Sequence, residues 1–226
     1  LIRQSEAQSL FRTKFLNEYD LPLSPQESEL TRQRRQSWQA KAQAQAETIV
    51  GINTGCSGVI AHKKLSVGGH RQLINELLNQ GVKNIVLLGG PEDTERNIEI
   101  GLDLPVIQSP TNKGLRDGLI SVAACDVVIS GDSLGMHMAI SQKKYVVAWF
   151  GPTCSQEIEF YGRGQAIQTL ASCAPCWKRA CDKSVMCYDQ VDFKKLAAIV
   201  SSLTVTSSSL GYASAPCRTN NPDLEF

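Results

Sequence analysis

The sequence has little net charge, no long hydrophobic run and no recognisable leader. Lys and Arg number 23 against 22 Asp and Glu, so a formal net charge of +1 provides no field that would recruit nucleic acid. The longest apolar runs, such as Tyr145–Phe150, are far shorter than the ~20 residues that span a bilayer. Residues 1–20 lack the unbroken apolar stretch and small-residue cleavage site of a signal peptide. These absences exclude a dedicated nucleic-acid binder and an integral membrane protein, and we expect a cytoplasmic chain that is a fragment or a processed product.

The length of 226 residues is enough for one or two ordinary domains, and a small disulfide-stapled fold is excluded. We expect three segments. Residues 1–47 are a helical lead-in that lies on the surface or links to a preceding domain, residues 48–203 form the main domain, and residues 204–226 are a polar, disordered tail. Within the lead-in, Ser24-Pro25-Gln26-Glu27 is a typical helix start and predicts a helix from about Pro25 to Gln45.

From Thr48 onward, short apolar runs rich in β-branched residues alternate with glycine turns and with segments of helical spacing. The runs that predict strands are Thr48–Asn53, Asn84–Leu88, a weaker one at Pro105–Gln108, Asp126–Ser130 and Tyr145–Phe150, and a last helix is predicted at about Asp192–Leu203. This alternation predicts an α/β fold with a Rossmann-like, doubly wound parallel sheet. Such sheets bind ligands at the carboxyl ends of their strands, so the function should be sought in the turns there.

Glycine turns follow four of the predicted strands. They are Asn53-Thr54-Gly55, Leu88-Gly89-Gly90-Pro91-Glu92, Ser130-Gly131-Asp132-Ser133 and Phe150-Gly151-Pro152-Thr153. Glycine lets the backbone come close to a ligand, and the free amides at the next helix start favour an anion. Four such turns on one edge indicate a phosphate-bearing ligand, although every α/β sheet needs turns of some kind.

One of these turns also matches a different chemistry, the G-x-S-x-G nucleophile elbow of serine hydrolases, at Gly131–Gly135. A hydrolase needs a histidine base, and the chain has three histidines, of which only His137 follows Ser133. His137 lies one turn along the same predicted helix, where it cannot easily face the serine hydroxyl. The hydrolase is therefore the weaker interpretation of this segment.

The same segment also suits an anion site. Asp132 or Ser133 can cap the helix, the amides of Ser133 and Leu134 face outward, and His137 is either a second donor or a structural histidine. A bare carboxylate repels phosphate, so Asp132 is better suited to sugar hydroxyls beside the phosphates. This interpretation predicts a phosphorylated sugar or nucleotide as the ligand.

Taken in order, these motifs resemble glycosyltransferase family 9, the lipopolysaccharide heptosyltransferases. The matching motifs are Gly51–Gly55, Lys63-Lys64, Leu87–Glu92 with Glu95, Gly131–His137, Phe150–Thr153, Glu157–Gly162 and the cysteines at 173, 176, 181 and 187. The resemblance covers about residues 5–203. It implies the C-terminal, nucleotide-sugar-binding domain of a GT-B glycosyltransferase.

The resemblance also implies a role for individual residues. Thr54 and Gly55 would contact the diphosphate, Lys63 would neutralise it, Glu95 would hold the ribose hydroxyls, and Asp132 would bind the transferred sugar. The amides of Ser133 and Leu134 would lie on the phosphates, and His137 would belong to the same donor-binding site. The loop before the lysine pair is long, so Lys64 stays an alternative to Lys63. The family's usual Asp-Ser/Thr-Gly-x-x-His has its glycine one position later here, at Gly135.

The implied reaction is transfer from a nucleotide-diphosphate sugar, with ADP-heptose favoured, to a lipopolysaccharide core acceptor. The catalytic base, an Asp, and the acceptor site would lie in an N-terminal half that precedes residue 1, and the enzyme could associate peripherally with the cytoplasmic face of the inner membrane. No metal cofactor is required, since Lys63 and backbone amides can neutralise the diphosphate. A non-catalytic nucleotide- or phosphosugar-binding module is the alternative.

The chain has eight cysteines, and four of them, Cys173, Cys176, Cys181 and Cys187, fall within fifteen residues. The spacing C-x2-C-x4-C-x5-C could close a structural zinc site. Disulfides and packed free thiols are the other two interpretations, and the residues alone do not decide among the three.

Overall fold

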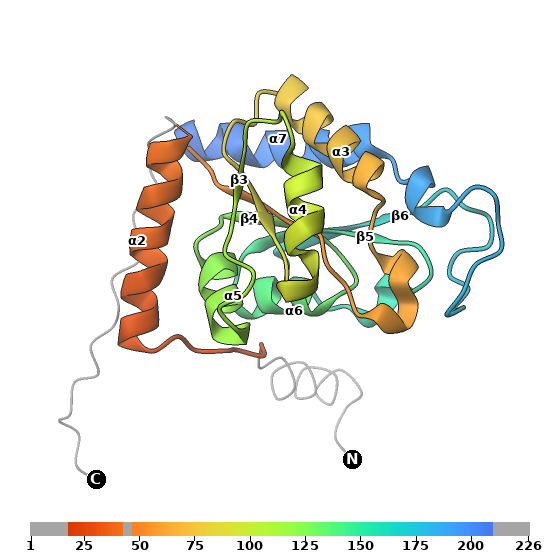
Figure 1. The fold of residues 1–226 in the computed structure, drawn as a ribbon, viewed down its shortest axis with the longest axis horizontal. Helices are drawn as coiled ribbons and strands as arrows, with labels where there is room; N and C mark the ends of the chain where they lie inside the picture. Colours follow the sequence, from red (N-terminus) through yellow and green to blue (C-terminus); the bar gives the residue numbers. More distant parts are fainter. Residues whose placement is uncertain (1–17, 43–46, 210–226) are drawn as a thin grey trace, which may run out of the picture.

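The computed structural model describes residues 18–42 and 47–209. Within them a parallel six-stranded sheet has the order β3-β2-β1-β4-β5-β6 (Figure 1). The strands are β1 (Val50–Asn53), β2 (Ile85–Leu88), β3 (Val106–Gln108), β4 (Val127–Gly131), β5 (Tyr145–Phe150) and β6 (Gly164–Gln168). The predicted doubly wound parallel sheet is confirmed, and its chain order reverses between β1 and β4, which is where such folds bind ligands.

The α-helices of the described chain are α2 (Pro25–Lys41), α3 (Val67–Asn79), α4 (Thr94–Gly101), α5 (Leu115–Ala123), α6 (Leu134–Ser141) and α7 (Phe193–Ser209). Short 3-10 helices are η1 (Gly58–Lys63), η2 (Pro91–Asp93), η3 (Ser155–Glu157) and η4 (Cys187–Gln190). The last helix ends six residues beyond its predicted end at Leu203, so the first part of the expected tail, up to Ser209, is helical. Residues 210–226, the rest of that tail, lie outside the described part.

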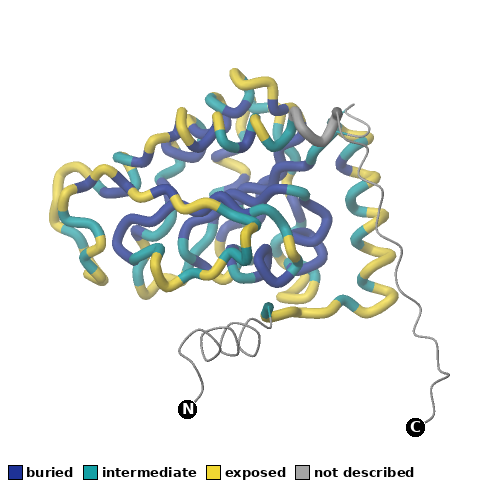
Figure 2. The backbone as a smooth tube through the Cα atoms, turned by 180° about the vertical axis from the view of Figure 1, so that it is seen from behind, coloured by how far each residue is buried: buried dark blue, intermediate teal, exposed yellow. Residues whose placement is uncertain are grey.

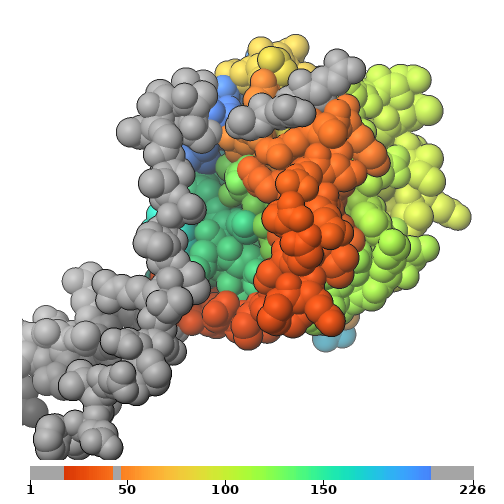
Figure 3. All heavy atoms as spheres, turned by 90° about the vertical axis from the view of Figure 1, so that its left-hand side faces the viewer, coloured from red at the N-terminus to blue at the C-terminus, as the bar shows by residue number. Residues whose placement is uncertain are grey.

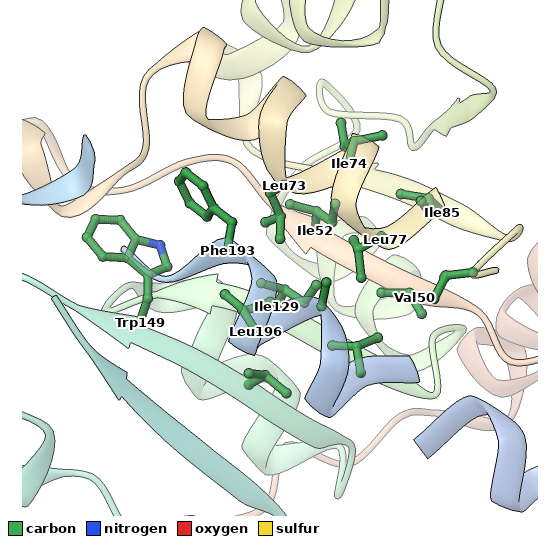
Figure 4. Packing of buried hydrophobic residues seen from close by; sticks show 14 of the residues in the cluster. Val50, Ile52, Leu73, Ile74, Leu77, Ile85, Ile129, Trp149, Phe193 and Leu196 are labelled. Carbon is green, nitrogen blue, oxygen red and sulfur yellow. The ribbon is translucent and has the colours of Figure 1, made fainter. Parts of the chain in front are cut away.

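The strands bury both faces, because alternate side chains enter two separate hydrophobic clusters. On one face Val50 and Ile52 pack with Leu73 of α3 and Leu196 of α7 (Figure 4). On the other face, residues such as Val128 pack with α5 and α6. The buried sheet runs through the middle of the domain (Figure 2). Because helices cover both faces of the sheet, the strands appear as continuous apolar runs in the sequence.

Helix α2 begins as predicted, with Ser24 and Glu27 forming a reciprocal capping box. It ends at Lys41 rather than near Gln45, with Ala42 as its C-cap, and residues 43–46 lie outside the described part. The buried side chain of Trp38 seats it on the domain. In Figure 3 the helix α2, in red-orange, lies on the surface of the domain and faces the viewer.

Candidate functional site

A pocket of about 730 Å³ opens at the carboxyl ends of β1, β2 and β4, at the point where the strand order reverses. Its walls come from the turns after these strands, from the loop between β3 and α5, and from one side of α5 and α6. Three of the four predicted glycine turns contribute to it, whereas residues 150–153, the turn after β5, do not line it. The pocket therefore lies at the edge of the sheet where the sequence predicts the ligand.

One end of the pocket carries a lysine and a carboxylate in contact. Lys63 Nζ lies 2.9 Å from Asp132 Oδ2, and each side chain keeps 18% of its surface exposed. The two segments meet closely because residue 131 is glycine, since a Cβ there would collide with the backbone oxygen of Lys63. Lys64 does not line the pocket, and its ammonium lies 3.7 Å from the buried carboxylate of Asp93. Of the two alternatives, Lys63 is therefore the cation that faces the pocket.

The start of α6 forms the wall beside this pair. The side-chain nitrogen Nδ2 of Asn53 donates to Ser133 Oγ at 2.9 Å and to Ser130 Oγ at 3.1 Å, and these bonds join the ends of β1 and β4. A Cβ at Gly135 would lie 2.5 Å from Asn53 Cγ, so the glycine at this position lets α6 pack against Asn53. Ser133, Leu134 and Gly135 all line the pocket, and the first amides of a helix have no acceptor within it. The arrangement favours an anion here.

The structure does not assemble a hydrolase triad. Ser133 Oγ is held by Asn53 and Ser130, while His137 Nδ1 lies 3.2 Å from the hydroxyl of Tyr19. In the described residues no carboxylate hydrogen-bonds to His137, and the other two histidines of the chain are buried away from the pocket lining. In the part of the chain that the structure describes, Ser133 therefore has no histidine base placed to activate its hydroxyl.

Replacing Ser133 by Ala should change nucleotide affinity and any transferase activity by less than about tenfold, because the backbone amide survives while one neutral hydrogen bond is lost. Isothermal calorimetry with ADP and a transfer assay with the complete enzyme check this. Loss of activity by several orders of magnitude, with the fold and the ADP affinity intact, would instead assign a nucleophile to Ser133.

Two expected contacts do not fit this geometry. Thr54 is fully buried, its hydroxyl bonds Asn97 and the carbonyl of Leu88, and its backbone N–H donates to that same carbonyl, so neither of its donors is free for a phosphate. Glu95 is exposed on α4 and does not line the pocket, whereas Glu92, in the preceding turn, does. Gly55 lies in the pocket wall as expected.

Asp93 has a structural role that the sequence analysis did not predict. It is almost fully buried, accepts the backbone N–H of Gly90 at 3.0 Å and would collide with any Cβ at Gly55. It therefore fixes the two turns after β1 and β2 against each other. The signal in the sequence was its place in the turn Gly89–Asp93, where a carboxylate three residues after glycine can accept an amide bond.

Residues of α5 and α6 give the pocket wall an apolar part, which we call the slot. Leu115 and Val122 of α5 and Leu134 and Met138 of α6 supply apolar walls. Gly118, in the middle of α5, leaves open space, since a Cβ there would have no heavy atom within 4 Å. An apolar slot next to an anion site suits a planar ring attached to phosphates.

The four clustered cysteines are free thiols. Burial, with the neighbouring thiols of Cys176, Cys181 and Cys173, raises the pKa of Cys187 to about 11. In residues 18–42 and 47–209 no group of three or more His, Cys, Asp or Glu is arranged to hold a metal ion. The zinc interpretation remains a prediction.

The geometry defines a Rossmann-like α/β domain with a pocket at its switch point. Residues 5–186 match glycosyltransferase family 9 (heptosyltransferase), and the chain belongs to this family. The resemblance stated from the sequence motifs is confirmed. No helix in the described segments has the length and apolar character needed to cross a membrane.

Solved structures support the fold. A family 9 glycosyltransferase from Veillonella parvula matches with a TM-score of 0.62 and 16% identity over 84% of this chain and 55% of that chain. The ADP-heptose lps heptosyltransferase II of E. coli matches with a TM-score of 0.56 and 17% identity over 84% of this chain and 54% of that one. This chain thus spans about half the length of these structures. The comparison with curated proteins gave no match.

Proposed function

We propose that the pocket binds a nucleotide-diphosphate sugar, with ADP-heptose favoured, and that the chain is the donor-binding, C-terminal half of a GT-B heptosyltransferase. The observation that carries this proposal is the meeting of Lys63, Asp132 and the start of α6 in a pocket whose wall also includes the apolar slot. Family membership supports it. A structure of E. coli heptosyltransferase WaaC with ADP, TM-score 0.50 and 16% identity over 70% of this chain and 46% of that one, has a similar fold.

The contacts suggest how the diphosphate would be held. Without a ligand, the ammonium of Lys63 is neutralised by Asp132. A diphosphate at the start of α6 carries more negative charge than the Asp132 carboxylate and therefore attracts the Lys63 ammonium. Asp132 is then released to accept hydrogen bonds from sugar hydroxyls. As the sugar leaves, negative charge grows on the diphosphate, and Lys63 with the helix amides stabilises that charge in the transition state.

Replacing Lys63 by Ala should weaken ADP binding by about 1.5 to 3 kcal/mol, which is the range for a hydrogen bond to a charged group. The loss has a second source, because Asp132 is left without its cation beside the phosphates. Calorimetry with ADP measures the effect.

Asp132→Asn should act in the opposite direction and tighten ADP binding, since it removes the repelling carboxylate and leaves Lys63 free.

Lys64→Ala is the matched control, since it removes an ammonium one residue away that pairs with Asp93 but does not itself line the pocket. It should lower the thermal stability, because a buried carboxylate loses its partner, but leave the ADP affinity of the folded protein nearly unchanged. If Lys64→Ala weakens ADP binding and Lys63→Ala does not, the assignment of the two lysines is wrong.

The acceptor belongs to the same proposal. We infer a lipopolysaccharide core acceptor, bound by an N-terminal half that also supplies the catalytic base, and a cytoplasmic enzyme that can contact the inner membrane peripherally. A non-catalytic nucleotide- or phosphosugar-binding module would bind the same diphosphate. Sugar transfer by the two halves together distinguishes an enzyme from such a module.

A further inference from the structure

The segment before α2, residues 18–24, is fastened to the domain on both sides of Tyr19. Glu18 forms an ion pair with Arg163 at 2.7 Å. The carbonyl of Leu21 accepts a hydrogen bond from Gln142 Nε2 at 2.6 Å. Gln142 follows α6 directly, so these contacts tie the segment to the helix whose start forms the anion end of the pocket. The backbone on each side of Tyr19 is therefore held in place.

Tyr19 contacts a single polar group of the pocket wall. Its hydroxyl lies 3.2 Å from His137 Nδ1, and the two rings lie with their centroids 6.3 Å apart. Tyr161 packs edge-on against Tyr19 at a centroid distance of 6.0 Å. Burial, reinforced by Tyr161, raises the pKa of the Tyr19 phenol, which therefore keeps its proton and can donate it.

We propose that Tyr19 is a positioning residue for His137. The Tyr19 hydroxyl donates a hydrogen bond to His137 Nδ1 and so holds the imidazole proton on Nε2. A neutral imidazole has one donor and one acceptor nitrogen, and the hydrogen bond at one of them decides which carries the proton. In the described residues Nδ1 makes the one hydrogen bond of this ring, and His137 lines the pocket. Nε2–H is then left as a donor for a ligand.

The chemistry of the pocket explains why the tautomer matters. Phosphate oxygens accept hydrogen bonds and donate none at neutral pH, so Nε2–H attracts a diphosphate while an unprotonated Nε2 repels it. This use of the proton rests on the proposed function. The tautomer itself does not, because Tyr19 and His137 are in contact without any ligand. The two statements can therefore be tested separately.

The first test is the neutral tautomer of His137, measured by nitrogen-15 NMR of the ligand-free protein at a pH that keeps histidines neutral. The chain has three histidines, so assignment by substitution is practical. We expect the wild type to carry the proton on Nε2 and Tyr19→Phe to show a mixture of both tautomers. Tyr161→Phe is the control, since it keeps an aromatic ring beside Tyr19 and leaves the Tyr19 hydroxyl in place. A wild type protonated on Nδ1, or a Tyr19→Phe variant with an unchanged tautomer, overturns the proposal.

The second test is calorimetry with ADP. Tyr19→Phe should weaken ADP binding about threefold to tenfold, the effect of one neutral hydrogen bond, and should cause no further loss in a His137→Ala background. An equal loss in that background would show that Tyr19 acts by another route and would overturn the proposal. A tautomer that depends on Tyr19, in a protein that binds no ADP, supports the role of Tyr19 and contradicts the proposed function instead.

Discussion

Sugar transfer should be undetectable with this chain alone and should appear when the N-terminal half of a family 9 enzyme is joined to it. With the donor bound, Asp132 is expected to accept hydrogen bonds from the sugar of the donor, and His137 Nδ1 is engaged with Tyr19, so neither is free to deprotonate an acceptor hydroxyl. The chain also spans about half the length of the solved family members. Without a second half, donor and acceptor are not held together, which can cost about 7 kcal/mol or more of the barrier.

The assay is radiolabelled sugar transfer from ADP-heptose to a Kdo-lipid A type acceptor, run with the short and the joined chain. The joined chain with Lys63→Ala serves as the control, because its activity must fall if turnover uses the pocket described above. Comparable turnover by the short chain would refute the two-half account and would require a base within residues 48–203.

Substitution of Gly118 should separate stability from binding. Gly118 lies inside α5, where glycine costs a helix about 0.5 to 1 kcal/mol relative to alanine, and neither a positive φ nor a close neighbour requires it. Gly118 lines the pocket together with Leu115 and Leu134. Gly118→Ala should therefore raise the free energy of unfolding by about 0.5 to 1 kcal/mol. Gly118→Leu should fill the slot and weaken ADP binding by about 2 to 3 kcal/mol, or some 30- to 150-fold.

Gly68 provides the matched control. It also lies in a helix, α3, where a Cβ would meet only Ser66 Oγ at 3.9 Å, but it is exposed and does not line the pocket. Gly68→Leu should leave the ADP affinity unchanged. Thermal unfolding and calorimetry on the variants at both positions give the comparison. An ADP affinity of Gly118→Leu equal to that of wild type would place the nucleotide elsewhere.

Much of the sheet could be predicted because its strands are buried on both faces. Runs such as Tyr145–Phe150 stay apolar for their whole length, and that strand has the predicted bounds. β6 was missed because Gly164–Gln168 is an edge strand in which Ile167 is the buried side chain and most others face solvent. The end of α7 was missed because its residues 204–209 are mostly Ser and Thr, which have low helix propensity.

The site was predicted less completely, because a turn motif gives the position of the backbone but not the direction of each side chain. Thr54 ends a strand facing inward, where it bonds Asn97 and not a ligand. The roles of Asn53 and Asp93 depend on contacts with Gly135 and Gly55, which are distant in sequence and meet across the sheet. Such close approaches are set by packing, and local sequence spacing does not report them.

Calorimetry of this chain with ADP, UDP and GDP tests the central claim most directly. The functions proposed for the pocket, for Lys63 and for the slot all require that a nucleoside diphosphate binds there. We predict saturable binding of one nucleoside diphosphate per chain, strongest for ADP, that is weakened by Lys63→Ala and by Gly118→Leu and unchanged by Gly68→Leu. Failure to bind any of the three nucleotides, or binding that neither pocket substitution affects, would contradict the account.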